Sequence, residues 1–194
     1  MNIGIIGRAR VGKDTAGAYF VEKHGYRRVA FADPLKEAAL SLDPIVDVSV
    51  TGDYFRLGEE VARWGWEAVK DDTPEVRRIL QELGAAMRAL DPDFWLRQAV
   101  ASAMKNGEDG VPTVITDVRY RNEAESLKRA GFHLVHIHRP GVPKLDHESE
   151  GALGWADAAV TVVNNGDITR LHERLERVWE DIHAAESRRF AMKF

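Results

Sequence analysis

The sequence predicts an α/β protein in which about five mainly parallel strands form a sheet with helices on both faces. Two observations lead to this expectation. Short apolar runs alternate with helix-like segments along the chain, and a glycine-containing loop follows the first run. Strands that alternate with helices favour right-handed crossovers, which make the strands parallel and distribute the helices over both faces. We therefore expect three layers, helix, sheet and helix.

The composition agrees with one folded domain over residues 1–194, since a domain takes roughly 150 residues. The hydrophobic fraction of 44% and the charged fraction of 30% are typical of globular proteins, and the net charge of −4 argues against a nucleic-acid polymer as partner. The chain has no cysteine, which excludes disulfides and cysteine-ligated zinc. No apolar run is long enough to span a membrane, and no basic segment opens a signal peptide, so we expect no membrane partner and a cytoplasmic location.

The first part of the chain is predicted to begin with a buried strand at residues 3–6, which ends at Gly7. The next expected elements are a helix over 14–22, a strand over 26–31 and a helix that runs to 42. Asp33 is expected to cap that helix, with Pro34 at its first position. Residues 43–72 carry weak local signals, and we expect them to form a helical excursion on the substrate side.

The second part of the chain is predicted to continue the alternation. Thr73 is expected to cap a helix that Asp91-Pro92 ends, and Asn106-Gly107 to end the next one. The further expected elements are a strand over 111–117, a helix over 122–130, a strand over 132–138, a strand over 159–163 and a helix from 168. Residues 140–156 contain several glycines and are expected to form a lid-like loop.

The segment from Gly7 to Lys13 matches the pattern G-x-x-x-x-G-K between a predicted strand and a predicted helix. Glycines at these places let successive backbone N–H groups turn inward, and the helix that follows adds the positive end of its dipole. Lys13 can then reach the β- and γ-phosphates of a nucleotide. A glycine-rich turn with a surface lysine is the alternative, but the spacing and the flanking elements favour a phosphate-binding loop, and with it a P-loop NTPase type of fold.

Asp14 follows the lysine, where serine or threonine is usual and would bind Mg²⁺. Asp14 could hold the ion directly or through water, or Thr15 could supply the oxygen, and the sequence leaves both open. Asp117 ends a buried strand, where it could orient Mg²⁺ or hold substrate at the carboxyl edge of the sheet. A helix cap is the alternative role for Asp117.

Phosphoryl transfer needs cations that stabilise the charge on the transferred group. The candidates are Arg77, Arg78, Arg119, Arg121 and Arg139. A solvated surface charge is the ordinary role of each, but Arg119 and Arg139 follow strands, which makes a functional role as well supported as a surface role for these two.

Aromatic and histidine side chains give weaker signals. Trp95 could stack on a base, although its periodicity favours a core aromatic. His136 and His138 share one face of a strand but lack a third ligand, so we favour structural histidines over a metal pair. His147, with Glu148 and Glu150, lacks the pattern of a zinc site.

The chain as a whole resembles the phage-type deoxynucleoside monophosphate kinases, within the P-loop nucleoside monophosphate kinase superfamily. The matching segments are 12–15, 31–36, 65–70, 76–84, 94–95, 116–123, 138–141, 147–150 and 163–166. The segments 76–84 and 116–123 are the most specific. An aspartate after the loop lysine is usual in this family, so Asp14 supports the resemblance.

This resemblance implies that the chain transfers a phosphoryl group from ATP to a deoxynucleoside monophosphate (dNMP), with a helical substrate-binding insertion. The implied residues for ATP and Mg²⁺ are Arg10, Gly12, Lys13, Asp14, Thr15 and Arg139, with Asp14 and Thr15 as the metal ligands. The implied residues for the dNMP are Lys36, Arg78, Gly84, Trp95, Asp117 and Glu123. Lys13, Asp117 and Arg119 would be catalytic. A homodimer and, for a phage protein, the host cytoplasm follow from the same resemblance.

Two alternatives stay open from the sequence. One is a P-loop kinase for another small acceptor, such as dephospho-coenzyme A, and the other is a switch that binds nucleotide without a second substrate. The chemistry of dNMP phosphorylation fits the residues present, because an acceptor phosphate with a second pKa of about 6 is largely dianionic at neutral pH and needs no strong base. The accepted bases, and the choice between deoxyribose and ribose, stay open.

Overall fold

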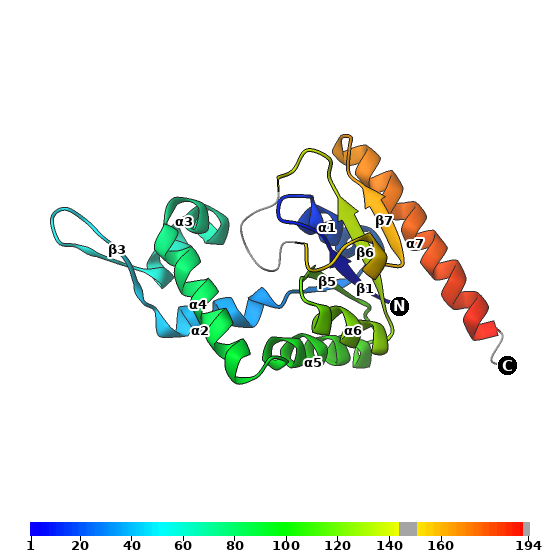
Figure 1. Cartoon of the computed structure of the whole chain (residues 1–194), viewed down its shortest axis with the longest axis horizontal. Coiled ribbons are helices and arrows are strands. Elements are labelled where there is room, and N and C mark those ends of the chain that lie inside the picture. The colour runs from blue at the N-terminus through cyan, green and yellow to red at the C-terminus, as the bar shows by residue number, and fades with distance from the viewer. Residues whose placement is uncertain (144–150, 192–194) are drawn as a thin grey trace. The chain divides into compact units, whose positions relative to one another are not determined.

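The computed structural model describes residues 1–143 and 151–191. It contains a five-stranded sheet with the order β2-β5-β1-β6-β7, and every pairing in this sheet is parallel (Figure 1). The strands are β1 (Asn2–Ile6), β2 (Arg27–Val29), β5 (Thr113–Val118), β6 (Phe132–His138) and β7 (Val160–Val163). The predicted parallel sheet is therefore confirmed.

Helices cover both faces of this sheet. Helices α1 (Lys13–His24) and α7 (Ile168–Ala191) pack on one face, around a core that includes Ile3, Phe20 and Leu175. Helix α6 (Arg121–Arg129) packs on the other face, where a Cβ added to Gly4 would lie 2.6 Å from Leu134. The expected helix–sheet–helix arrangement is present.

The chain forms two compact units. The first comprises Met1–Ala30 and Ala99–Phe194 and contains the sheet, and the second is Phe31–Gln98. The second unit contains α2 (Ala32–Leu42), β3 (Ile45–Val48), β4 (Tyr54–Arg56), α3 (Leu57–Asp72), α4 (Pro74–Leu90) and the start of α5 (Phe94–Glu108). Its small core is formed by Ala39, Val46, Leu57, Val69 and Val76. The excursion expected at 43–72 thus belongs to a longer unit.

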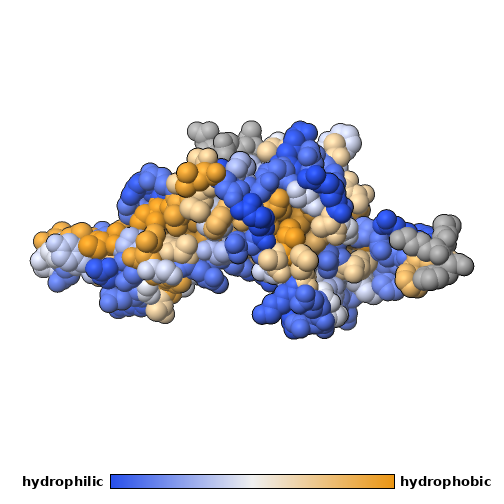
Figure 2. Space-filling model, turned by 90° about the horizontal axis from the view of Figure 1, so that it is seen from below, coloured by the Kyte–Doolittle hydropathy of each residue, from blue (hydrophilic) through white to orange (hydrophobic). Residues whose placement is uncertain are grey.

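Residues 43–72 contain a hairpin that the sequence did not predict. Strands β3 and β4 pair antiparallel, and α3 follows with a kink at Gly65, whose φ is +79°. Figure 2 shows apolar side chains gathered over the hairpin, and the exposed ones include Ile45, Val48, Val50 and Tyr54. Short strands with exposed apolar residues give no alternation of polar and apolar positions. The hydrophobic pattern therefore does not predict these two strands.

Two predicted helix ends were wrong. Helix α2 begins at Ala32, and Phe31 already has helical angles, so Asp33 lies inside the first turn and is not the cap. Helix α5 continues through Asn106 to Glu108, because the Asn106 amide is buried and donates to the Thr113 hydroxyl at 2.9 Å. Thr73 does occupy the cap position of α4, but its side chain makes no capping hydrogen bond. Among the helices described, none is both long and apolar enough to cross a membrane.

Candidate active site

The loop between β1 and α1 requires glycine at two positions. Gly7 has a φ of +145°, and a Cβ there would lie 2.5 Å from the carbonyl oxygen of Ile137. Gly12, at the N-terminus of α1, has a φ of +100°, and its Cβ would lie 2.7 Å from Nδ2 of Asn164. Arg10 is also left-handed, with a φ of +62°. The two glycines of the motif are therefore required both by backbone angle and by space.

The lysine of the motif lies inside this loop. Its side chain is buried, with 8% of the residue exposed, and Nζ donates to the carbonyl oxygens of Gly7 at 2.9 Å and Arg8 at 2.7 Å. These contacts place the Lys13 ammonium within the turn of backbone that precedes the N-terminus of α1. A cation beside the free N–H groups of a helix end is an arrangement that binds anions.

Asn164 contacts this loop, and the sequence did not single it out as a candidate site residue. It follows β7, and its buried amide donates from Nδ2 to the carbonyl oxygen of Val11 at 2.9 Å. Its own backbone N–H donates to the carbonyl oxygen of His138 at 2.6 Å. The sequence Asn-Asn-Gly predicts a turn, and only the position after a buried strand could have suggested more.

Side chains with carboxylate or hydroxyl oxygens lie at the beginning of α1 and at the end of β5. Asp14 is exposed in the first turn of α1, Thr15 is half-buried beside it, and Asp117 is half-buried one residue before the end of β5. The methyl group of Thr116 packs against Gly17 of α1, and its buried hydroxyl has no hydrogen-bond partner among the residues that the structure describes. The carboxyl end of β5 therefore lies beside the first turns of α1.

Glu123 organises the segment between β5 and α6. Its carboxylate is buried and accepts the backbone N–H groups of Arg119 at 2.8 Å and Tyr120 at 3.0 Å. The negative charge also lies in the first turn of α6, where the helix dipole favours it. Glu123 thus fixes the backbone that carries Arg119, whose side chain is exposed, as is that of Arg139 after β6.

The remaining predicted substrate residues lie in the second unit. Trp95 is buried, with 4% exposed, and its indole N–H donates to the carbonyl oxygen of Gly84 at 3.3 Å. Gly84 is itself buried in α4, against Leu35. These contacts favour the core-aromatic alternative for Trp95. Lys36 lies with Nζ 5.4 Å from the centre of the Trp66 ring, a cation–π contact.

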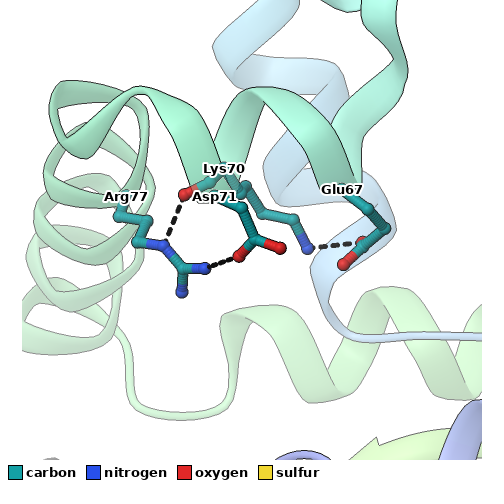
Figure 3. Close-up of polar contacts among 4 residues, drawn as sticks. All are labelled: Glu67, Lys70, Asp71 and Arg77. Atoms are coloured by element: carbon teal, nitrogen blue, oxygen red, sulfur yellow. Dashed lines mark hydrogen bonds and ion pairs between the residues drawn. The ribbon is translucent and has the colours of Figure 1, made fainter.

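The arginines of α4 are engaged with carboxylates. Arg78 is exposed and forms ion pairs with Glu75 at 2.5 Å and Glu82 at 2.6 Å, and the hydrogen bond to Glu75 is the main reason that the pKa of Arg78 is raised. Arg77 donates to the carboxylate of Asp71 and to the carbonyl oxygen of Lys70 (Figure 3). In this structure the guanidinium groups of Arg77 and Arg78 each form an ion pair with a carboxylate.

His136 lies on β6 near the loop, and Nδ1 is 3.3 Å from the Thr161 hydroxyl. Burial lowers the pKa of His136 below its usual 6.5, and the nearby charges of His138 and Arg8 lower it further, while Asp157 opposes them. In residues 1–143 and 151–191 no three acidic, cysteine or histidine side chains are grouped to hold a metal. His147 and its acidic neighbours lie outside the described residues.

Comparison with known proteins agrees with this geometry. A family model described as deoxynucleotide monophosphate kinase matches residues 58–175, more than half of the chain. A protein of Acanthamoeba polyphaga mimivirus, provisionally named deoxynucleotide monophosphate kinase, is 31% identical over 191 residues, which cover 89% of this chain and 93% of the relative. The deoxynucleotide monophosphate kinase of Escherichia phage RB69 is 27% identical over 56% of this chain, and the match spans 46% of that enzyme.

Solved structures of kinases share the fold. A dephospho-CoA kinase from Campylobacter jejuni is similar with a TM-score of 0.51 and 11% identity, over 95% of this chain and 98% of that one. A sugar kinase from Janibacter sp. HTCC2649 is similar with a TM-score of 0.50 and 15% identity, over 95% and 96%. At these identities the likeness to the solved structures shows the fold alone. The family model and the mimivirus relative, by contrast, match this chain in amino-acid sequence. The chain therefore belongs to the deoxynucleotide monophosphate kinase family, a family of phosphotransferases.

Proposed function

We propose that the chain transfers the γ-phosphate of ATP to a dNMP, giving a deoxynucleoside diphosphate and ADP, by in-line transfer that Mg²⁺ assists. The observation that carries the proposal is the position of the Lys13 ammonium, 2.9 Å and 2.7 Å from two carbonyl oxygens of the loop before α1. Burial of an ammonium costs free energy, and in this structure the two loop carbonyls offset that cost. A nucleotide phosphate would give the ammonium an anionic partner at the same place.

The first unit supplies groups for the donor nucleotide. The loop amides and the N-terminus of α1 would bind the phosphates, and Lys13 would exchange its carbonyl partners for phosphate oxygens. Arg10 and Arg139 are exposed cations that would add to ATP binding. Arg119, held by the contact of its backbone with Glu123, would stabilise charge on the transferred group.

The oxygen atoms beside the loop fit a hard cation. Asp14, Thr15 and Asp117 offer carboxylate and hydroxyl oxygens, which Mg²⁺ prefers, and the buried hydroxyl of Thr116 lacks a partner among the described residues. Asp14 and Thr15 would hold the ion. When bound, Mg²⁺ neutralises charge on the phosphates during transfer. A carboxylate such as Asp14 so close to a phosphate site would otherwise repel the nucleotide.

The second proposed role is binding of the acceptor dNMP. Lys36 and Arg78 supply cations for the dNMP phosphate, and Asp117 holds substrate at the carboxyl edge of the sheet. Trp95 and Gly84 shape the backbone and core of α4 and α5, and Glu123 acts through the backbone of Arg119. No strong general base is required, because the acceptor phosphate is largely dianionic at neutral pH.

A coupled assay of ADP formation tests the proposal. It uses ATP and Mg²⁺ with each of the four dNMPs, with dephospho-coenzyme A, and with no acceptor. We expect turnover with at least one dNMP and little without an acceptor. Turnover with dephospho-coenzyme A alone would identify a different acceptor kinase, and tight ATP binding without any acceptor turnover would identify a switch. Light scattering of the purified chain tests the homodimer that we include in the proposal, and imaging of infected cells tests location in the host cytoplasm if the protein is viral.

A further inference from the structure

We infer that Asn164 is a positioning residue that holds the phosphate loop in the shape that binds nucleotide; this inference rests on the proposed function of the loop. Asn164 lies 153 positions from Val11 in the sequence, yet its amide donates to the Val11 carbonyl oxygen at 2.9 Å. Only 6% of Asn164 is exposed. A buried amide that makes such a long-range bond to a motif loop does more than form a turn.

The bond determines where a loop N–H points. A trans peptide is planar, so the carbonyl of Val11 and the N–H of Gly12 point in opposite directions. When Asn164 holds the Val11 carbonyl, the Gly12 N–H is directed away from Asn164. Gly12 is the cap of α1, and its N–H belongs to the donors that a helix end offers to an anion. Asn164 would thus act on phosphate through one peptide plane.

Asn164 is itself held firmly. Its backbone N–H donates to His138 at 2.6 Å, directly after the β6–β7 pairing that joins His138 to Val163. Its Nδ2 also limits the space at Gly12, where a Cβ would lie 2.7 Å away, and Leu171 of α7 lies 3.8 Å from the same point. The residue that follows the edge strand β7 therefore holds the loop, and Gly12 leaves room for the Asn164 amide because it has no side chain.

Asn164→Ala and Asn164→Ser, with Asn165→Ala as the exposed control, test this inference. Loop misplacement of about 1 Å can cost 10²-fold in rate, so we expect kcat/KM for ATP to fall by roughly 10- to 100-fold in Asn164→Ala. ADP affinity, measured by calorimetric titration, should fall by about tenfold or more, with the KM for dNMP within about twofold of native. Asn165→Ala should match the native protein in each measurement.

Hydrogen exchange separates positioning from a general structural role. In Asn164→Ala, the amides of residues 8–14 should exchange faster, while those of β1 and β6 exchange as in the native protein. If Asn164→Ala does not fold, Asn164→Ser, which keeps a short hydroxyl donor, is judged by the same measurements. Faster exchange throughout the sheet, or ADP affinity equal to native in the variant that folds, would overturn the inference.

A double-mutant cycle tests the contact with Gly12 directly. Gly12→Ala should weaken ADP binding less in the Asn164→Ala background than in the native background, because the 2.7 Å conflict with Nδ2 is then removed. Additive losses would contradict the contact. ADP binding and hydrogen exchange are measured without an acceptor. A native protein that binds ADP but phosphorylates no dNMP would therefore refute the proposed function, and the Asn164 variants would still test the positioning role. A native chain that does not bind ADP overturns both.

Discussion

Replacing Lys13 with alanine should abolish most turnover and leave the fold intact. The two hydrogen bonds from Nζ to the carbonyls of Gly7 and Arg8 are charge-assisted, and such bonds contribute about 1.5–3 kcal/mol each. The buried ammonium loses hydration that costs several kcal/mol, roughly the same amount. Because these opposing contributions nearly cancel, we expect the free energy of unfolding of Lys13→Ala to stay within about 2 kcal/mol of native.

No comparable compensation is expected for the effect of Lys13→Ala on kcat. Removal of one group that stabilises developing charge lowers kcat by about 10²–10³-fold, and we expect a loss of this size in the coupled assay with ATP and dNMP. Urea unfolding followed by circular dichroism measures the stability. Lys23→Ala, which removes an exposed cation from the last turn of the same helix, is the control and should keep native kcat. Unchanged kcat in Lys13→Ala, with the fold intact, would refute the assignment of the loop.

Three further predictions concern groups around the loop and in the second unit. Glu123→Gln should lower the free energy of unfolding by about 1–3 kcal/mol in urea, because a buried charged acceptor is lost, whereas the exposed Glu125→Gln should not; equal stability would argue against the backbone role. Trp95→Ala should cost about 3–5 kcal/mol while Trp64→Ala costs far less, and a raised KM for dNMP in Trp95→Phe at native stability would instead indicate base stacking. Burial lowers the pKa of His136, so the unfolded chain takes up a proton before the folded chain does as the pH falls through 6.5. The free energy of unfolding should therefore decrease below that pH. Urea titrations at several pH values measure this decrease, which should be smaller in His136→Gln.

The sheet was predictable because its signals are local. A buried parallel strand is a continuous apolar run, and β6 begins and ends at the predicted residues, while β1 and β7 differ by a residue at one end. The loop was equally predictable, because the spacing of Gly7 and Gly12 is a property of a few neighbouring residues. In the loop between β1 and α1, the short motif itself contains most of the information about the backbone conformation.

The hairpin and the misplaced helix ends depend on contacts between distant residues. Asn106 would end a helix by its own preference, but Thr113 offers its amide a buried partner, so the helix continues. Val46 is buried in the second unit while its neighbours in β3 are exposed, and the register shifts within this short strand. No local pattern encodes either outcome. The contact of Asn164 with Val11, 153 positions apart, is a further example.

The ion pairs of Arg78 do not argue against its expected role in binding substrate. Glu75 and Glu82 stand three and four positions from Arg78 on one helix, so these pairs form wherever the helix does and need no tertiary contact. All three side chains reach solvent, Glu75 the least, and water and salt screen such pairs strongly. A phosphate dianion brings two charges to the same guanidinium, whereas the Glu75 carboxylate, which already pairs with both Nε and Nη2, brings one. The carboxylates therefore keep Arg78 extended from the helix surface without binding it tightly enough to exclude a phosphate.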